Sequence, residues 1–283
     1  MKKNPWRLLA ALFLALALVA AACGGVDEEE STGSPSAPAE EGEDGGEGEE
    51  ASGEGDVEVY CEKTLAIETV PEPDIDFESM SEEEQAEAAK EFATAELQGL
   101  AQEIEAAAPE EISEDVAVLV GAVDEIAETG NFAAFEEPEV EAASDRVHEF
   151  DLENCGWERV DVTAVDYEFQ GVPETVPAGA VSFEFANESE AEAHEFVLFR
   201  KNDGTTESVE DLLALGEEEA EKKITFAGAT FAPPGDSDPL VAELEAGDYA
   251  AVCFIPVGAT EENQEGTGPP HFTQGMTVEF TVE

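Results

Sequence analysis

After the first eighty residues, apolar side chains recur every three or four positions, which is the spacing of one face of a helix. Ser81 and Glu84 form a capping box at the start of the first such stripe, and Pro109 ends it. Gly130 is placed to cap the second stripe, and Pro138 opens the third in the first turn, where proline is tolerated. Each stripe covers one side only, so we predict a small antiparallel bundle. The three stripes are Ala93, Leu97, Leu100 and Ile104; Val116, Leu119, Val120, Val123 and Ile126; and Val140, Ala143, Val147 and Phe150.

Beyond residue 157 the period changes to two, which is typical of strands with one buried face. Turn signals such as Gly171-Val-Pro173 and Gly247-Asp248 divide the runs, and a helix is expected from about Ser208 to Lys222. The predicted fold class is α+β and multidomain: a helical domain at 57–157, then an all-β Greek-key sandwich at 158–283. The segment VEVYCEKTLAIETV, before the first helix, fits either a strand or a short helix. The alternating residues are Val160, Val162, Ala164, Tyr167 and Phe169; Val181, Phe183 and Phe185; and Phe196 and Leu198.

The N-terminus has the pattern of a secretory signal peptide at residues 1–22, a basic MKKNPWR followed by an apolar run. The run ends in small residues before Cys23, which resembles a bacterial lipoprotein signal. That resemblance implies acylation of Cys23 and a lipid anchor on the extracytoplasmic face of the cell membrane. Ordinary secretion, with Cys23 removed or left free, is the alternative.

The next segment, 23–56, is rich in Gly, Ser, Pro, Ala, Glu and Asp and contains no Lys or Arg. It cannot bury enough apolar surface to offset its ordering entropy, so we expect a disordered acidic tether. The whole chain carries 71 acidic against 11 Lys and Arg residues, a formal charge of −60. A surface of this charge repels nucleic acid, which is therefore excluded as a partner.

Two cysteines, Cys61 and Cys155, lie at the two ends of the helical segment. In a secreted protein such thiols pair readily, and we expect a disulfide between them. That pairing leaves Cys253 without a thiol partner. Pairing of Cys253 with Cys61 or with Cys155 stays open as an alternative and would remove the metal site considered next.

The C-terminal region brings together residue types that bind copper. His194, Cys253, His271 and Met276 follow one another along the strand-rich part of the chain. A thiolate, two imidazoles and a weak axial thioether are the ligand set of a blue-copper electron-transfer site. The third histidine, His148, has no such neighbours in sequence and is expected to be half-buried or on the surface.

Three segments of this region resemble the cupredoxins, the plastocyanin-like and azurin-like blue copper proteins. They are VPAGAVSFEFANESEAEAHEFVLF, LEAGDYAAVCF and PHFTQGMTVEFTV. The resemblance implies a β-sandwich with copper at one end, held by His194, Cys253, His271 and Met276, with Gly275 allowing the last turn to close. Seventeen residues separate Cys253 from His271, where the family usually has only a few. The ends of such a loop can still lie close together, because closure entropy grows slowly with length.

These features lead us to expect a lipid-anchored protein that binds one copper ion and exchanges single electrons with a redox partner protein. Copper storage or delivery with the same ligands is the first alternative. A metal-free interaction module that keeps the sandwich, with Cys253 packed as a small apolar side chain, is the second. No nucleophile context or phosphate loop is present, so we do not expect an enzyme. The sequence leaves the oligomeric state undetermined.

Overall fold

The computed structural model describes residues 56–71, 80–260 and 266–283. The predicted signal peptide, the lipidation of Cys23 and nearly all of the predicted tether lie outside these residues and stay predictions. Within the described residues, no helix combines the length and apolar character needed to cross a membrane.

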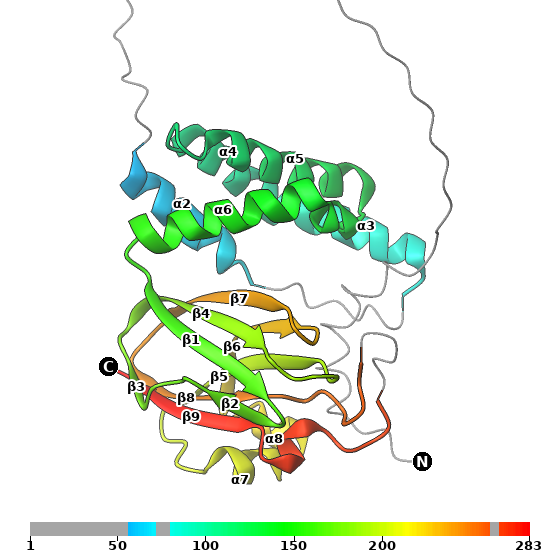
Figure 1. The fold of residues 1–283 in the computed structure, drawn as a ribbon, viewed down its shortest axis with the longest axis vertical. Coiled ribbons are helices and arrows are strands. Elements are labelled where there is room, and N and C mark those ends of the chain that lie inside the picture. The colour runs from blue at the N-terminus through cyan, green and yellow to red at the C-terminus, as the bar shows by residue number, and fades with distance from the viewer. Residues whose placement is uncertain (1–55, 72–79, 261–265) are drawn as a thin grey trace, which may run out of the picture.

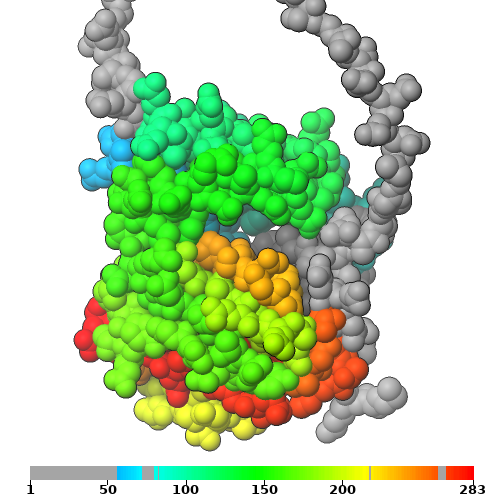
Figure 2. Space-filling model, viewed as in Figure 1, coloured from blue at the N-terminus to red at the C-terminus, as the bar shows by residue number. Residues whose placement is uncertain are grey.

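A helical part comes first, as predicted, and lies as a layer against one face of the sandwich (Figures 1 and 2). The segment that fitted either a strand or a helix is a helix, capped by Asp56, whose carboxylate accepts the backbone N–H groups of Glu58 and Val59. The elements are α2 (Val57–Glu68), α3 (Glu82–Phe92), η2 (Ala93–Leu97), α4 (Gln98–Ala107), α5 (Ser113–Thr129), η3 (Phe132–Glu136) and α6 (Pro138–Asn154).

The first predicted helix is interrupted by a π-helical turn, η2, which the apolar spacing did not reveal. Its capping box is present, since Ser81 N–H donates to Glu84 at 2.9 Å while the Ser81 hydroxyl accepts from Glu84 N–H. A π turn inserts an extra residue into the helix and rotates the face that follows. In α4 the buried residues are accordingly Ala101 and Ile104, whereas Leu100 is half-buried.

The helical part is closed by a disulfide between Cys61 in α2 and Cys155 just after α6, with their Cα atoms 5.3 Å apart. The predicted pairing is therefore confirmed, and Cys253 is a free, buried cysteine. Beside the bridge, Tyr60 is fully buried with its ring edge-on to Phe150, at a centroid distance of 5.8 Å.

Two sheets form the sandwich that follows, with strand orders β2-β1-β4-β7 and β3-β9-β8-β5-β6. The change from helix to strand falls between Asn154 and Glu158, next to the predicted boundary, and the predicted fold class is confirmed. The strands are β1 (Glu158–Val165), β2 (Glu168–Gln170), β3 (Thr175–Val176), β4 (Gly179–Asn187), β5 (His194–Lys201), β6 (Ile224–Ala232), β7 (Ser237–Leu244), β8 (Gly247–Val252) and β9 (Thr277–Val282).

The core between the sheets is built on clustered phenylalanine rings from both layers. Phe196 of β5 lies 5.2 to 6.0 Å from the rings of Phe169, Phe183 and Phe185 on the opposing sheet. Burial of aromatic rings dominates the energetics of such a core. The rigid sandwich fixes the ends of its strands, where the site residues lie.

Two details of the predicted sandwich are wrong. The single helix expected from Ser208 to Lys222 is two short ones, α7 (Val209–Leu213) and α8 (Glu217–Ala220), because the chain turns at Gly216, whose carbonyl accepts the first bonds of α8. Tyr167 is not an inward strand residue. It lies with Asp166 in the two-residue turn that joins β1 to β2, and both have positive φ, 71° and 36°.

The two parts meet at α2, α6, β4 and β7. His148 of α6 lies 3.0 Å from a carboxylate oxygen of Glu184 in β4, with both side chains about 20% exposed. The predicted half-buried state of His148 is confirmed, and its role is a polar contact between the two parts.

Candidate metal centre

The site lies at one end of the sandwich, where strands from one sheet begin and end. His194 is the first residue of β5, and Cys253 directly follows β8. Because these two strands are antiparallel neighbours, with Val197 opposite Val252, the start of one lies beside the end of the other. His271 opens the short helix η4 (His271–Gln274), which precedes β9. The topology thus brings together residues far apart in sequence.

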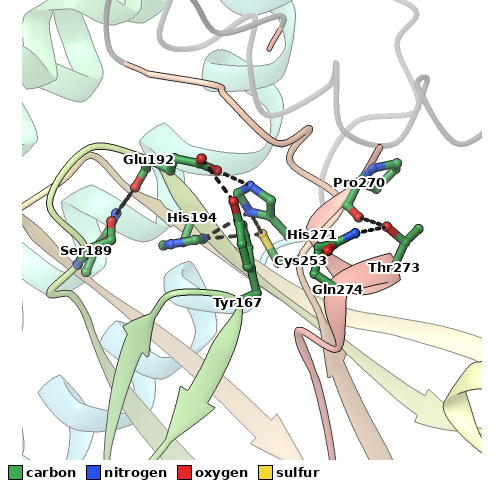
Figure 3. Close-up of polar contacts among 10 residues, drawn as sticks. Tyr167, Ser189, Glu192, His194, Cys253, Pro270, His271, Thr273 and Gln274 are labelled. Carbon is green, nitrogen blue, oxygen red and sulfur yellow. Dashed lines mark hydrogen bonds and ion pairs between the residues drawn. The ribbon is translucent and has the colours of Figure 1, made fainter. Parts of the chain in front are cut away.

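The ligand atoms of the three residues lie within 4.8 Å of one another, and all three side chains are buried. Cys253 Sγ is 3.3 Å from His271 Nδ1 and 3.9 Å from His194 Nδ1. The two Nδ1 atoms are 3.1 Å apart. Figure 3 shows both imidazoles and the thiol directed toward one point. The structure therefore brings together three of the four predicted ligands through their donor atoms.

Met276, the fourth predicted ligand, lies in the same turn and is completely buried. Its backbone N–H donates to the carbonyl of His271 at 3.3 Å, and its carbonyl accepts from Cys253 N–H at 3.2 Å. Gly275 precedes it with a φ of 107°, a conformation that favours glycine, as the predicted turn closure requires.

The long loop between Cys253 and His271 has its two ends joined, as predicted. Pro256 and Pro270 form an isolated β-bridge, and Val257 N–H donates to the carbonyl of Pro269 at 3.0 Å. The backbone N–H of His271 donates to Ile255 at 2.8 Å. The insertion therefore leaves the position of His271 beside Cys253 intact.

A carboxylate that the sequence did not single out orients His271. Glu192 Oε2 lies 2.7 Å from His271 Nε2, and Glu192 Oε1 accepts the hydroxyl of Tyr167 at 3.0 Å (Figure 3). Glu192 also accepts a hydrogen bond from the backbone of Gly258, in the long loop. With Nε2–H donated to Glu192, His271 Nδ1 keeps its lone pair toward Cys253.

A second buried carboxyl, Glu195, links the two strands that carry ligands. Its Oε1 accepts the backbone N–H of Phe254 at 2.7 Å, tying the residue after His194 to the residue after Cys253. Its Oε2 and His194 Nε2 have no hydrogen-bond partner among the described residues. Burial raises the pKa of Glu195 to about 8, although the Phe254 hydrogen bond opposes the shift.

The electrostatics of the site favour neutral imidazoles. Burial, and then the charge on His271, lower the pKa of His194 to about 4, and burial also lowers the pKa of His271. Burial raises the pKa of the Cys253 thiol, with the Glu195 carboxyl adding to the effect. A metal that takes the thiolate must therefore displace a proton, as is usual for cysteine ligands.

The sequence missed Glu192, Glu195 and Tyr167 for different reasons. Glu192 lies in the acidic run ESEAEAH, where the general excess of glutamate hides one carboxylate with a function. Glu195 carried a usable signal, since it is an acid inside the apolar run HEFVLF. Tyr167 was assigned to a strand because its turn lacks the glycine or asparagine that usually marks a hairpin.

Comparison with known proteins gives a likeness only at the level of structure. No family model matches the chain, and no curated protein matches it either. The chain is similar to Na-dithionite reduced auracyanin from the photosynthetic bacterium Roseiflexus castenholzii, at 21% identity, over 44% of this chain and 96% of that one, with a TM-score of 0.32.

Two further solved structures are similar over 45% of this chain. Auracyanin A, a "blue" copper protein from the green thermophilic photosynthetic bacterium Chloroflexus aurantiacus, is 17% identical over its whole length, with a TM-score of 0.30. Rusticyanin from Thiobacillus ferrooxidans is 18% identical over 79% of its length, with a TM-score of 0.29.

Proposed function

We propose that the sandwich is a cupredoxin domain that binds one copper ion through His194, Cys253, His271 and Met276 and exchanges single electrons. The observation that carries the proposal is the convergence of two imidazole Nδ1 atoms and one thiol sulfur within 3.9 Å of one another in a fully buried setting. This donor set, with a methionine in the adjoining turn, is the one that suits copper. Copper supplies a one-electron couple when it is bound.

The contribution of the chain is to hold the donors in place. β5 and β8 fix His194 and Cys253 relative to each other, and the Glu195 hydrogen bond to Phe254 N–H adds a link at the site itself. Glu192 fixes the ring orientation of His271. A site held in this way changes its geometry little between two charge states, which favours rapid electron exchange.

Copper storage or delivery is the second candidate, and one observation favours it. All four proposed ligands are at most 1% exposed, so no partner can touch a ligand directly. Burial of the ligands would protect copper in a storage protein, whereas an electron carrier needs a path for electrons between the buried ligands and the surface.

Location and anchoring belong to the same proposal. The lipoprotein-like leader supports an extracytoplasmic protein anchored to the cell membrane through Cys23, with an acidic tether before the folded part. We propose a carrier rather than an enzyme, with a redox protein as its partner and no nucleic-acid ligand.

Titration of the full-length protein with Cu(II) tests the proposal. Electron transfer predicts an intense visible absorption from thiolate to copper at one equivalent, together with a reversible one-electron wave in voltammetry. Tight Cu(I) binding without a reversible wave would indicate storage or delivery. Absence of copper uptake would contradict both and leave an interaction module.

A further inference from the structure

Because the proposed ligands are buried, electrons must cross other residues between the site and the surface. His194, Cys253, His271 and Met276 are between 0% and 1% exposed. An external one-electron carrier must therefore contact a residue that is itself partly exposed and that touches a ligand.

Tyr167 meets both conditions. Its ring is half-buried, and its centroid is 4.8 Å from that of His271. Its hydroxyl donates to Glu192, which also holds His271, so the ring is fixed to the ligand from two directions (Figure 3). One side chain thus joins the buried imidazole to the surface.

The backbone at this turn is held in an uncommon conformation. Asp166 and Tyr167 both have positive φ, as a type I′ hairpin turn requires, although neither is glycine. Bulky residues adopt this region rarely and at a cost in energy. The position of the Tyr167 ring beside His271 is therefore set by this turn and not by the in-and-out alternation of a strand.

A second aromatic route leads through Phe272, which is also half-buried. Its ring contacts that of Phe254 at 5.6 Å, and its backbone N–H donates to the Cys253 carbonyl at 2.9 Å. This route therefore approaches Cys253 through a backbone contact, whereas the ring of Tyr167 lies beside the ring of a ligand. The charge around the two routes also differs. Asp166 and Glu168, both exposed, flank Tyr167, whereas the neutral Thr273 and Gln274 follow Phe272.

We propose that Tyr167 is the contact through which electrons enter and leave the site, and that its partner is a one-electron carrier with a positively charged face. This inference rests on the proposed copper function. The acidic flank orients a cationic partner on the ring by charge complementarity. The one-electron step leaves all bonds of the protein intact: the carrier loses one electron and becomes oxidised as Cu(II) becomes Cu(I).

Three variants that each raise the net charge by two test the location. Asp166→Asn with Glu168→Gln neutralises the tyrosine flank, and asparagine tolerates the positive φ of residue 166. Thr273→Lys with Gln274→Lys changes the phenylalanine flank. Glu243→Lys, exposed on β7 opposite the start of β4, changes the far end of the sandwich.

Stopped flow follows the reduction of the copper-loaded proteins by hexaammineruthenium(II), which becomes hexaammineruthenium(III). The variants compared have the same visible spectrum and reduction potential as the wild type. At about 0.1 M salt, where screening acts over about 10 Å, we expect a three- to tenfold slower rate for the tyrosine flank and less than twofold for the others. The differences should vanish at about 1 M salt. Equal slowing of all three variants, or slowing only at the phenylalanine flank, overturns the proposal.

A second measurement needs no copper. Inert, paramagnetic hexaamminechromium(III), added to the metal-free protein, should broaden the amide signals of residues 166–168 before those of residues 272–274 in NMR spectra. Broadening that starts at residues 272–274 contradicts the proposal. If the wild type shows no thiolate–copper absorption, the proposed function fails, and this inference with it. If absorption is present but rate and broadening follow Phe272, only this inference fails.

Discussion

In the helical part, Cys61 and Cys155 are joined across 94 positions of sequence, whereas in the sandwich Cys253 lies buried between two imidazoles, with no second thiol near it among the described residues. Cysteine therefore occurs in two different settings in one chain, as half of a disulfide and as a free thiol beside two imidazoles. The helical part brings a second thiol to Cys61 because α2 and the end of α6 lie side by side. The sandwich brings nitrogen donors to Cys253 because β5 begins where β8 ends. Topology, which decides what faces each sulfur, separates a structural cysteine from a candidate ligand.

Replacing the sulfur of Cys253 by oxygen removes the feature that distinguishes the sandwich from the helical part. We expect Cys253→Ser to abolish the thiolate–copper absorption completely, because serine offers no thiolate. Visible spectra during Cu(II) titration measure this effect. Copper-dependent colour that survives in Cys253→Ser would show that another residue supplies the sulfur.

The reciprocal change removes the bridge of the helical part. The double substitution Cys61→Ser with Cys155→Ser should lower the free energy of unfolding by about 4 kcal/mol, since the bridge closes a loop of 94 positions in the unfolded chain. Denaturant unfolding followed by circular dichroism measures the loss. The copper absorption should stay unchanged, and its disappearance would show that the two regions are not independent.

Within the site, Glu192 holds the ring of His271 through a hydrogen bond. Glu192→Gln replaces a charged acceptor by a neutral one, and outer partners of metal-bound histidines contribute about 10- to 100-fold to metal affinity. We expect about tenfold weaker copper binding in competition titrations. Glu190→Gln, two residues earlier and exposed, is the matched control and should bind as the wild type does. Equal affinity in both variants would remove Glu192 from the site.

The smallest effect is expected where the two regions meet. Burial alone would lower the pKa of His148, but its hydrogen bond and charge interaction with Glu184 outweigh burial and raise it. A raised folded-state pKa means that this stabilisation is complete below about pH 6.5 and is lost as the pH rises through the folded value.

His148→Gln should therefore remove about 1 kcal/mol of stability at pH 6 and less at pH 8. Urea unfolding at both pH values checks the expectation. Adding Glu184→Gln to His148→Gln should not change the difference in unfolding free energy between pH 6 and pH 8 any further, because the charged contact is already lost. An equal loss at both pH values would contradict a charged contact.

The sequence predicted those features that depend on local periodicity and on residue chemistry. The helices α5 and α6, the alternation of Val181, Phe183 and Phe185, and the disulfide were predicted correctly. The π turn of η2 was missed because Leu97 and Leu100 keep a helical spacing across it, although the extra residue shifts the buried face of α4 to Ala101 and Ile104.

The outer parts of the site were missed because they depend on tertiary contacts. Ligand types and order sufficed to propose His194, Cys253, His271 and Met276. The partnership of Glu192 with His271 joins residues 79 positions apart, which no local pattern reveals. Division into two independently folding domains stays a prediction.

Copper K-edge X-ray absorption of the full-length protein loaded with one equivalent of copper shows whether the thiolate of Cys253 and two imidazoles bind the metal. We expect one short copper–sulfur bond and two nitrogen ligands with imidazole scattering. Copper surrounded only by oxygen and nitrogen would contradict this expectation, because the thiol of Cys253 would then have no part in the site.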